Sequence, residues 1–302
     1  TNMKKTNQPL VSVIMPVYNA GEYLAEAIES ILDQTYQNFE FIILDDASTD
    51  SSWKIIQSYK RRYLKIIRAY RLKKNLNRGG DTCANIAISK AHGTFIARMD
   101  ADDIAHPKRL EKQVAYLVKN PQVAILGTQA YVINKQGRSM GVKSVPQEHN
   151  EIYQNYAIFH PLIHPTVMMR KNQMPKRKSF YKIKYSANND LYTFIGMLKN
   201  RQFANLPEKL LYYRVHGAND SLTKPKERFF NTLKIRLEAV KYLGYRPSLK
   251  NVFINIAQAA VIFVLPEIFI VPVYLYMKGI VKPVLKIPLS LPTLSGIKSF
   301  VY

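Results

Sequence analysis

The sequence predicts an α/β fold in which a mostly parallel sheet is flanked by helices. Two observations predict it. Short apolar runs typical of buried strands alternate with stretches whose apolar residues recur at helical spacing. Carboxylates directly follow two of these runs. Because such strands and helices are joined by right-handed crossovers, the carboxyl ends of the strands share one edge of the sheet, where these folds bind ligands.

The elements of the first half follow in order. Ser48 or Asp50 is expected to cap the helix at residues 51–61. Gly93 is expected to end the helix at residues 81–91 as its C-cap, and Pro107 suits the first position of the next helix. We expect strands at residues 11–15, 39–44, 64–69, 94–99 and 123–133, and helices at residues 21–35, 51–61, 81–91 and from 107 onward.

Acidic residues stand where two of these strands end. Asp45 and Asp46 follow the second strand, and Asp100–Asp103 closes the fourth. An unpaired buried charge costs several kcal/mol, so these side chains should face solvent or a cation. Several carboxylate oxygens close together suit Mg²⁺ or Mn²⁺ bound to a phosphate-bearing substrate. The alternative is an acidic turn that is simply exposed to solvent. Tyr18, after the first strand, could stack on a base or cover the core.

Composition and missing motifs limit the alternatives. No G-x-G-x-x-G follows the first strand, so the Rossmann dinucleotide pattern is absent, and no P-loop occurs either. The formal charge of +23 and the pI near 9.9 indicate an anionic partner: nucleic acid, a membrane surface or a substrate. The single cysteine, Cys83, excludes an internal disulfide and suits a reducing compartment.

Four segments carry a resemblance to a known family. They are PVYN (16–19), DDASTD (45–50), NRGGDTCAN (77–85) and RMDADD followed by HPKRLEKQ (98–113). In this order and spacing they closely resemble family 2 glycosyltransferases of the GT-A fold, from about Val11 to about Ser221. The resemblance implies a transferase domain at residues 11–225, with a nucleotide-sugar half (11–134) and an acceptor half (135–225). Residues 1–10 are then a leader or tag remnant, and 226–302 a helical extension.

The resemblance also implies a donor site. Tyr18 would stack on the nucleobase, Asp46 would hydrogen-bond it, and Asp100 would approach the ribose or the metal. Asp102 would be the main ligand of Mn²⁺ or Mg²⁺, with Asp100 as the second metal residue. The residues expected to bind the nucleotide sugar are Pro16, Val17, Tyr18, Asp46, Arg78, Asp100, Arg214 and His216.

The segment Ser186–Phe194 is similar to the part of the family that supplies the catalytic base. With Phe194 at the family's aromatic position, Asp190 is the base and Asn189 stands where Glu is usual. A register shifted by two residues would place Asn188 there and leave no carboxylate. Asp190 could also be a simple helix cap.

Two further groups stay open. His160 and His164 could contact the acceptor or could be loop residues packed near prolines. The basic loop at residues 175–184 could close over the donor.

The C-terminal part is basic and apolar. Residues 226–242 predict an amphipathic helix, and 252–277 are the most apolar stretch, interrupted at Pro266. We expect two helices that lie in a membrane face rather than cross it, with Lys278, Lys282 and Lys286 near anionic headgroups. A helical subdomain or a dimer interface is the alternative.

The sequence therefore predicts an inverting, metal-dependent glycosyltransferase of the hexosyltransferase type. Its partners would be a nucleotide-sugar donor, with a UDP-sugar expected, a glycan or lipid-linked acceptor of surface-polysaccharide assembly, and an anionic membrane surface. We expect it to be cytoplasmic, peripheral or monotopic on the inner face of the membrane. It could form an oligomer through the C-terminal helices.

Three other functions compete with this one. A degenerate relative could bind the nucleotide sugar without turnover, and a polyprenyl-phosphate sugar synthase would use a different acceptor. A nucleic-acid-binding protein would cluster its basic residues on one face, but here they are spread along the chain, so we expect no nucleic-acid partner.

Overall fold

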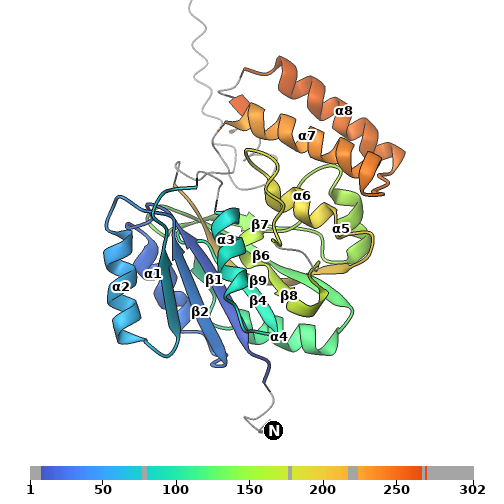
Figure 1. The fold of residues 1–302 in the computed structure, drawn as a ribbon. Coiled ribbons are helices and arrows are strands. Elements are labelled where there is room, and N and C mark those ends of the chain that lie inside the picture. Colours follow the sequence, from blue (N-terminus) through green and yellow to red (C-terminus); the bar gives the residue numbers. More distant parts are fainter. Residues whose placement is uncertain (1–7, 77–79, 176–178, 217–223, 267–268, 271–302) are drawn as a thin grey trace, which may run out of the picture.

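The computed structural model describes residues 8–76, 80–175, 179–216, 224–266 and 269–270 (Figure 1). In this part of the chain nine strands form one sheet, ordered β3-β2-β1-β4-β8-β6-β9-β5, with β7 paired to β6. The strands are β1 (Val11–Val17), β2 (Phe39–Asp45), β3 (Ile67–Arg71), β4 (Phe95–Arg98), β5 (Ile104–Ala105), β6 (Val123–Asn134), β7 (Ser139–Lys143), β8 (Met168–Arg170) and β9 (Gln202–Val215).

Helices cover both faces of this sheet (Figure 1). The α-helices are α1 (Leu24–Leu32), α2 (Ser52–Arg62), α3 (Asp81–Ser89), α4 (Arg109–Lys119), α5 (His149–Asn155), α6 (Asn189–Ile195), α7 (Pro225–Tyr242) and α8 (Leu249–Val264). Two short 3₁₀ helices, His164–Thr166 and Lys171–Gln173, flank β8.

The predicted fold class is confirmed, and the sheet has two different halves. Strands β3, β2, β1 and β4 are all parallel. Beyond β4 the pairing is mixed, because β8 is antiparallel to both β4 and β6, whereas β6 and β9 are parallel. The parallel half therefore collects the carboxyl ends of β1, β2 and β4 at one edge, as the sequence predicted.

The core lies on both sides of the parallel half. Val13 on β1 packs in one cluster with Leu24 of α1, and its neighbour Ile14 packs in another with Ala84 of α3. Because successive side chains point to opposite faces, a strand covered on both faces must be apolar throughout. This explains why the first strands read as continuous apolar runs.

Some predicted boundaries were wrong. Helix α3 ends at Ser89 with Lys90 as its C-cap, so Gly93 caps nothing. Gly93 instead allows a close approach, since a Cβ there would lie 2.5 Å from the backbone nitrogen of Ser12. The third strand begins at Ile67 rather than at Leu64, which is exposed.

The predicted cap of α2 was also placed differently. Its N-cap is Ser51, which makes no side-chain cap bond. Asp50 accepts hydrogen bonds from the backbone of Ser52 and of Gly21, both at 2.9 Å, and so ties the loop after β2 to the loop after β1.

The C-terminal hairpin consists of α7 and α8. The predicted amphipathic helix is α7, and α8 ends at Val264, just before Pro266. No helix within the described residues is long and apolar enough to span a membrane. The expected second apolar helix and the lysines at 278, 282 and 286 fall almost wholly outside the described residues.

Candidate active site

The first wall of the site is the edge where β1 and β2 end. Val17 and Asp45 are neighbours across the two strands, and the Asp46 backbone N–H donates to the Val17 carbonyl at 2.8 Å. Asp46 is nearly buried, and its carboxylate accepts from the Leu76 backbone at 3.0 Å. Burial raises the pKa of Asp46, against the effect of these hydrogen bonds. Tyr18, the residue after Val17, is half-exposed, so its ring is available to a ligand.

An arginine that the sequence reasoning did not select, Arg98, lies at the centre of this edge. It ends β4 and is 4% exposed. Its Nε lies 3.0 Å from Asp100 Oδ1, and its Nη1 lies 3.6 Å from Asp81 Oδ1. Burial alone would lower the pKa of Arg98, but Asp100, the nearby Tyr181 and Asp81 raise it, so the guanidinium stays charged. An arginine closing an apolar run just before three carboxylates was the available signal.

A glycine makes room for this cation. Gly80 has φ +78°, and a Cβ there would lie 3.3 Å from Arg98 Nη2 and 3.4 Å from Pro16 Cβ. Pro16, near the end of β1, therefore touches the loop that leads into α3. The preceding residues 77–79, which include the predicted phosphate-binding Arg78, lie outside the described residues.

The three carboxylates after β4 differ in exposure. The side chains of Asp100 and Asp102 are 33% and 28% exposed, whereas Asp103 is buried. Asp103 Oδ1 accepts from the Arg214 backbone N–H at 2.8 Å. Burial, reinforced by the charges of Asp102 and Asp100, raises the pKa of Asp103 well above its usual value. Asp103 is thus part of the support, and Asp100 and Asp102 face the open side.

Arg214 and His216 come from the end of β9. Arg214 is buried; its Nε donates to the Asp102 carbonyl at 2.8 Å, its Nη1 to the Lys135 carbonyl at 3.1 Å, and its Nη2 contacts Glu26. Arg214 therefore holds the backbone of the acidic turn. His216 Nε2 lies 3.0 Å from Asp102 Oδ2.

These residues allow a test of whether a divalent cation fits. Within the described residues no group of three or more His, Cys, Asp or Glu side chains could hold a metal on its own. Asp102, in the acidic turn after β4, and His216, directly after β9, nevertheless place an oxygen and a nitrogen side by side. Mg²⁺ in phosphate-binding sites commonly takes only one or two carboxylates and completes its shell with phosphate oxygens and water. The donor set therefore fits a cation that arrives with a diphosphate.

The second wall of the site is built around Asp190, in the first turn of α6. His160 Nε2 lies 3.1 Å and His164 Nδ1 3.5 Å from Asp190 Oδ2. The Leu162 N–H donates to His160 Nδ1 at 3.4 Å, and the Tyr181 hydroxyl lies 2.9 Å from His164 Nε2. Because the Leu162 N–H donates to His160 Nδ1, the proton of the neutral His160 ring lies on Nε2, the nitrogen nearer to Asp190. Neither histidine is merely packed against a proline.

The titration of this group follows from its surroundings. Burial alone would raise the pKa of Asp190, but His160 and His164, with a backbone hydrogen bond from Leu191, hold it below its usual value. Burial, aided by the charge of Arg98, lowers the pKa of His164 to about 3. At neutral pH the centre is therefore an ionised carboxylate beside a neutral imidazole.

The two asparagines before Asp190 have separate structural tasks. Asn188 has φ 62° and donates from Nδ2 to the Arg228 carbonyl of α7 at 3.0 Å. Asn189 is buried; its Oδ1 accepts from the backbone of Lys184 and Tyr185, both at 2.9 Å, and its Nδ2 donates to the Tyr185 carbonyl at 3.0 Å. A glutamate could not donate that last bond. Asn188 and Asn189 are thus bound to the surrounding backbone, whereas Asp190 contacts the two histidines.

A chain of contacts joins the two walls. The Arg98 guanidinium lies 5.9 Å from the centre of the Tyr181 ring, and Tyr181 contacts His164. Burial lowers the pKa of Lys143 of β7, and the charges of Asp103, Asp100 and Asp190 all oppose that shift. The strand-end carboxylates and Asp190 thus belong to one electrostatic neighbourhood.

Comparison with known proteins identifies the family. The family described as glycosyl transferase family 2 matches residues 12–184, which is more than half of the chain. The chain belongs to this family. The resemblance inferred from the four sequence segments is therefore confirmed.

Relatives of this family 2 glycosyltransferase include uncharacterised and assigned proteins. It is 33% identical to an uncharacterised glycosyltransferase of Methanocaldococcus jannaschii, over 90% of this chain and 94% of that protein. It is also 33% identical to the O-antigen biosynthesis glycosyltransferase WbnJ of Escherichia coli, over 69% of this chain and 80% of that protein.

Solved structures agree on the fold. Staphylococcus aureus TarS 1–349 in complex with UDP matches with a TM-score of 0.61 and 19% identity, over 85% of this chain and 73% of that one. The mannosyltransferase PcManGT of Pyrobaculum calidifontis, in complex with GDP-Man and Mn²⁺, matches with a TM-score of 0.56 and 16% identity, over 91% and 85%. At these identities the likeness shows the fold alone.

Proposed function

We propose that this glycosyltransferase moves a hexosyl unit from a nucleoside diphosphate sugar, a UDP-sugar foremost, to a hydroxyl of a glycan or lipid-linked acceptor, with inversion. The observation that carries the proposal is the carboxylate of Asp190, which lies between His160 and His164. The O-antigen relative and the UDP-bound structural neighbour support the choice of substrates.

The acceptor half supplies the base. A sugar hydroxyl is a poor nucleophile, so its proton must leave as the new bond forms. Asp190 would accept that proton while the hydroxyl oxygen attacks the anomeric carbon and the bond to the diphosphate breaks. In a single displacement of this kind the configuration inverts. The two imidazoles would keep the carboxylate ionised and oriented toward the acceptor.

The donor half would bind the leaving group. Tyr18 would stack on the base, Asp46 would accept a hydrogen bond from it, and Pro16 and Val17 would form the floor. Mn²⁺ or Mg²⁺, when bound, would neutralise the negative charge that develops on the departing diphosphate.

The metal and the diphosphate have their own proposed ligands. Asp102 and His216 would hold the ion, with Asp100 near the ribose or the metal. We propose that Arg214 positions the acidic turn through its hydrogen bond to the Asp102 carbonyl, and that Arg78 binds the phosphates.

This assignment divides the chain into parts. Residues 11–134 would form the nucleotide-sugar half, residues 135–225 the acceptor half, and residues from 226 onward a helical appendage. The proposed place of action is the cytoplasmic face of the membrane, where a lipid-linked acceptor would be met.

Two substitutions test the proposal. Asp190→Asn should abolish release of UDP from a UDP-sugar plus acceptor while leaving UDP affinity unchanged, because the amide keeps the shape but cannot take the proton.

Asp102→Ala should abolish transfer and also weaken Mn²⁺-dependent UDP binding by at least tenfold, about 1.4 kcal/mol. Calorimetric titration with UDP and Mn²⁺ measures the binding.

The control is Asp33→Asn, at an exposed carboxylate after α1. It should change neither quantity. Full turnover in Asp190→Asn would remove this residue as the base.

A further inference from the structure

Both helices of the hairpin formed by α7 and α8 bury polar side chains and expose large apolar ones. The buried residue of α8 is Asn251, and those of α7 are Asn231 and Arg236 together with the apolar Ile235 and Ala239. Helices on a protein surface normally show the opposite arrangement. The exposed apolar residues of the two helices are Phe230, Leu237, Val240, Tyr242, Leu249, Val252, Phe253, Ile256, Val261, Phe263 and Val264.

Hydrogen bonds fix this orientation. Arg236 donates from Nε to the Tyr156 carbonyl at 3.0 Å and from Nη1 to Asn255 Oδ1 at 2.7 Å. Asn251 donates from Nδ2 to the Gln154 carbonyl at 2.9 Å. Rotating either helix to bury its apolar face would leave these groups without partners, at a cost of about 1–3 kcal/mol each. The apolar face is therefore held outward by the body of the protein.

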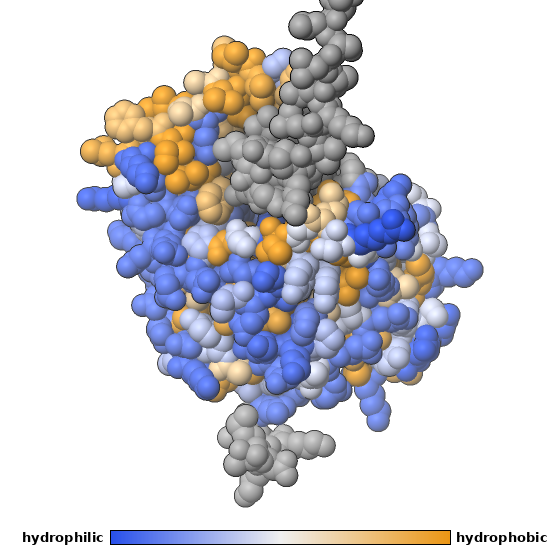
Figure 2. Space-filling view, turned by 180° about the vertical axis from the view of Figure 1, so that it is seen from behind, coloured by the Kyte–Doolittle hydropathy of each residue, from blue (hydrophilic) through white to orange (hydrophobic). Residues whose placement is uncertain are grey.

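The outward side chains form one surface. Figure 2 shows hydrophobic residues gathered over the hairpin, while most of the remaining visible surface is hydrophilic. Contiguous exposed apolar patches of this kind commonly mark sites that bind another protein or a membrane. The patch needs an occupant that is apolar.

Charge selects the occupant. The basic residues of the hairpin outnumber its two carboxylates, Glu227 and Glu238, and Glu238 is paired with Lys184. A second copy docked face to face would bring like charges together, whereas anionic headgroups would compensate them. The basic residues of the hairpin that are not buried are Lys224, Lys226, Arg228, Lys234, Lys241, Arg246 and Lys250.

We propose that the outer face of α7 and α8 docks on an anionic lipid surface, with Phe253 and Leu237 among the side chains that enter the acyl boundary. Helix α8 has 16 residues and so runs about 24 Å, which suits a helix lying along the surface. The docking does not depend on glycosyl transfer.

The hairpin also connects this surface to the candidate base. Asn188, two residues before Asp190, donates to the Arg228 carbonyl and to Thr232 Oγ1 at 2.9 Å. The lipid surface would thus lie at a fixed distance from Asp190. This consequence rests on the proposed function, since it matters only if the acceptor is lipid-linked.

Vesicle binding of the full chain tests the docking. The protein should co-sediment with phosphatidylcholine vesicles that contain phosphatidylglycerol, and poorly with phosphatidylcholine alone. Phe253→Glu and Leu237→Glu should each weaken the partition coefficient about tenfold or more. The matched control is Leu64→Glu between α2 and β3, because Leu64 and Leu237 are both 70% exposed. It should bind vesicles as the parent protein does.

Three results would overturn the proposal. The glutamate variants could bind as tightly as the parent. Binding could be lost in salt yet be indifferent to Phe253→Glu, which would mean adsorption by charge only. Light scattering could instead show a dimer that Leu237→Glu dissociates, with no vesicle binding, which would make a second copy the occupant.

Two further readouts complete the experiment. Circular dichroism melting confirms that each variant folds, and UDP binding should stay unchanged in Phe253→Glu. Vesicle binding as expected together with full turnover in Asp190→Asn would leave the docking in place and end the proposed function.

Discussion

At the scale of single residues, the site depends on polar groups whose neighbours decide their charge. Asp190 is flanked by two imidazoles that keep its pKa low, whereas Asp103 is buried beside two carboxylates that push its pKa up. The same residue type therefore serves as a candidate base in one place and as a support in another. The difference lies in what surrounds each carboxyl group.

The environment of Asp190 predicts a pH profile. Because its pKa lies below the usual value, the base stays ionised as pH falls, and kcat/KM should be flat from pH 8 to about pH 5. In His160→Leu burial is no longer offset by this imidazole, so the pKa rises and an acid limb should move up into that range. His164, Lys143, Tyr156 and Tyr181 also face the carboxylate and stay in place.

The conservative variant serves as the control. His160→Gln keeps an N–H donor toward Asp190 and should restore much of the flat profile. An identical profile in parent and His160→Leu would show that this histidine does not tune the base.

Asn189 gives a second prediction at this scale. Asn189→Ala removes three hydrogen bonds that the buried Asn189 side chain makes with the backbone of Lys184 and Tyr185. The free energy of unfolding should fall by about 2–4 kcal/mol. Denaturant titration measures it, with Asn200→Ala at an exposed position as the control. Equal midpoints for the two variants would contradict the structural role.

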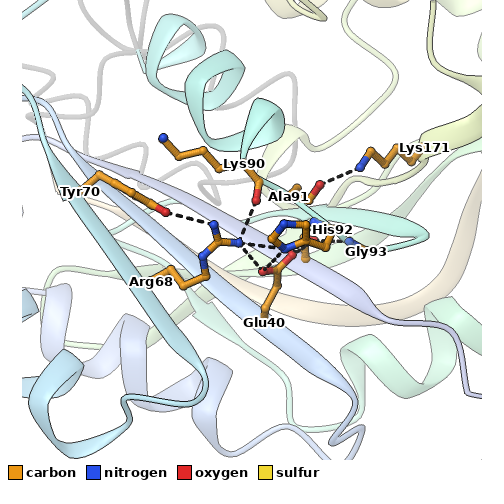
Figure 3. A network of polar contacts seen from close by, with 9 residues as sticks. Glu40, Arg68, Tyr70, Lys90, Ala91, His92, Gly93 and Lys171 are labelled. Atoms are coloured by element: carbon orange, nitrogen blue, oxygen red, sulfur yellow. Dashed lines mark hydrogen bonds and ion pairs between the residues drawn. The ribbon is translucent and has the colours of Figure 1, made fainter.

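At the scale of elements, the two ends of the parallel strands carry different kinds of polar group. The carboxyl ends bear the open carboxylates of the site. The opposite end is closed by the network around Glu40 of β2 (Figure 3). Glu40 accepts from Ser12 at 2.6 Å, from the His92 backbone at 2.6 Å and from Arg68 at 2.8 Å. This network joins β1, β2 and β3 to the loop after α3.

This network predicts an acid-dependent stability. Burial alone would raise the pKa of Glu40, but its hydrogen bonds to Ser12, His92 and Arg68 lower it from 4.5 to about 2. A lowered folded-state pKa stabilises the fold fully above pH 4.5, and the stabilisation is lost as pH falls toward 2. The difference is on the order of 3 kcal/mol.

Glu40→Gln should therefore cost a few kcal/mol at pH 7 and little near pH 2, as measured by denaturant unfolding at several pH values. Glu208→Gln, in an exposed ion pair with Lys112, should change stability by less than about 1 kcal/mol. A pH-independent loss in Glu40→Gln would point to packing instead of charge.

At the scale of the whole molecule, the parallel half of the sheet, its mixed half and the C-terminal hairpin all contribute to the candidate site. The parallel half presents Asp46, Asp100 and Asp102, and the mixed half contributes Lys143 and His216. The hairpin is attached to the same region by Asn188, which lies two residues before Asp190 and donates a hydrogen bond to α7. A ligand that bridges the halves should therefore stabilise the entire fold.

Thermal melting measures this coupling. UDP with Mn²⁺ should raise the melting temperature by several degrees more than UDP alone, because a ligand at 100 times its Kd adds about 2.7 kcal/mol. The metal-dependent part should vanish in Asp102→Ala and persist in Asp33→Asn. An equal Mn²⁺ effect in Asp102→Ala would place the ion elsewhere.

The sequence by itself determined the fold class and the family. Hydrophobic patterning is local, so mostly apolar runs such as Val11–Val17 can be recognised from neighbouring residues. The carboxylates Asp45–Asp46 and Asp100–Asp103 could likewise be assigned to one edge, because parallel strands place their ends together.

Only the tertiary structure decided which polar groups touch. His160 and His164 meet Asp190, Arg98 binds Asp81 and Asp100, and α8 faces its amides inward. These contacts join residues far apart in the chain, and a side chain's partners and burial depend on packing that no local pattern encodes. The same reason explains why Gly93 was mistaken for a helix cap: its true neighbour is Ser12, on another strand.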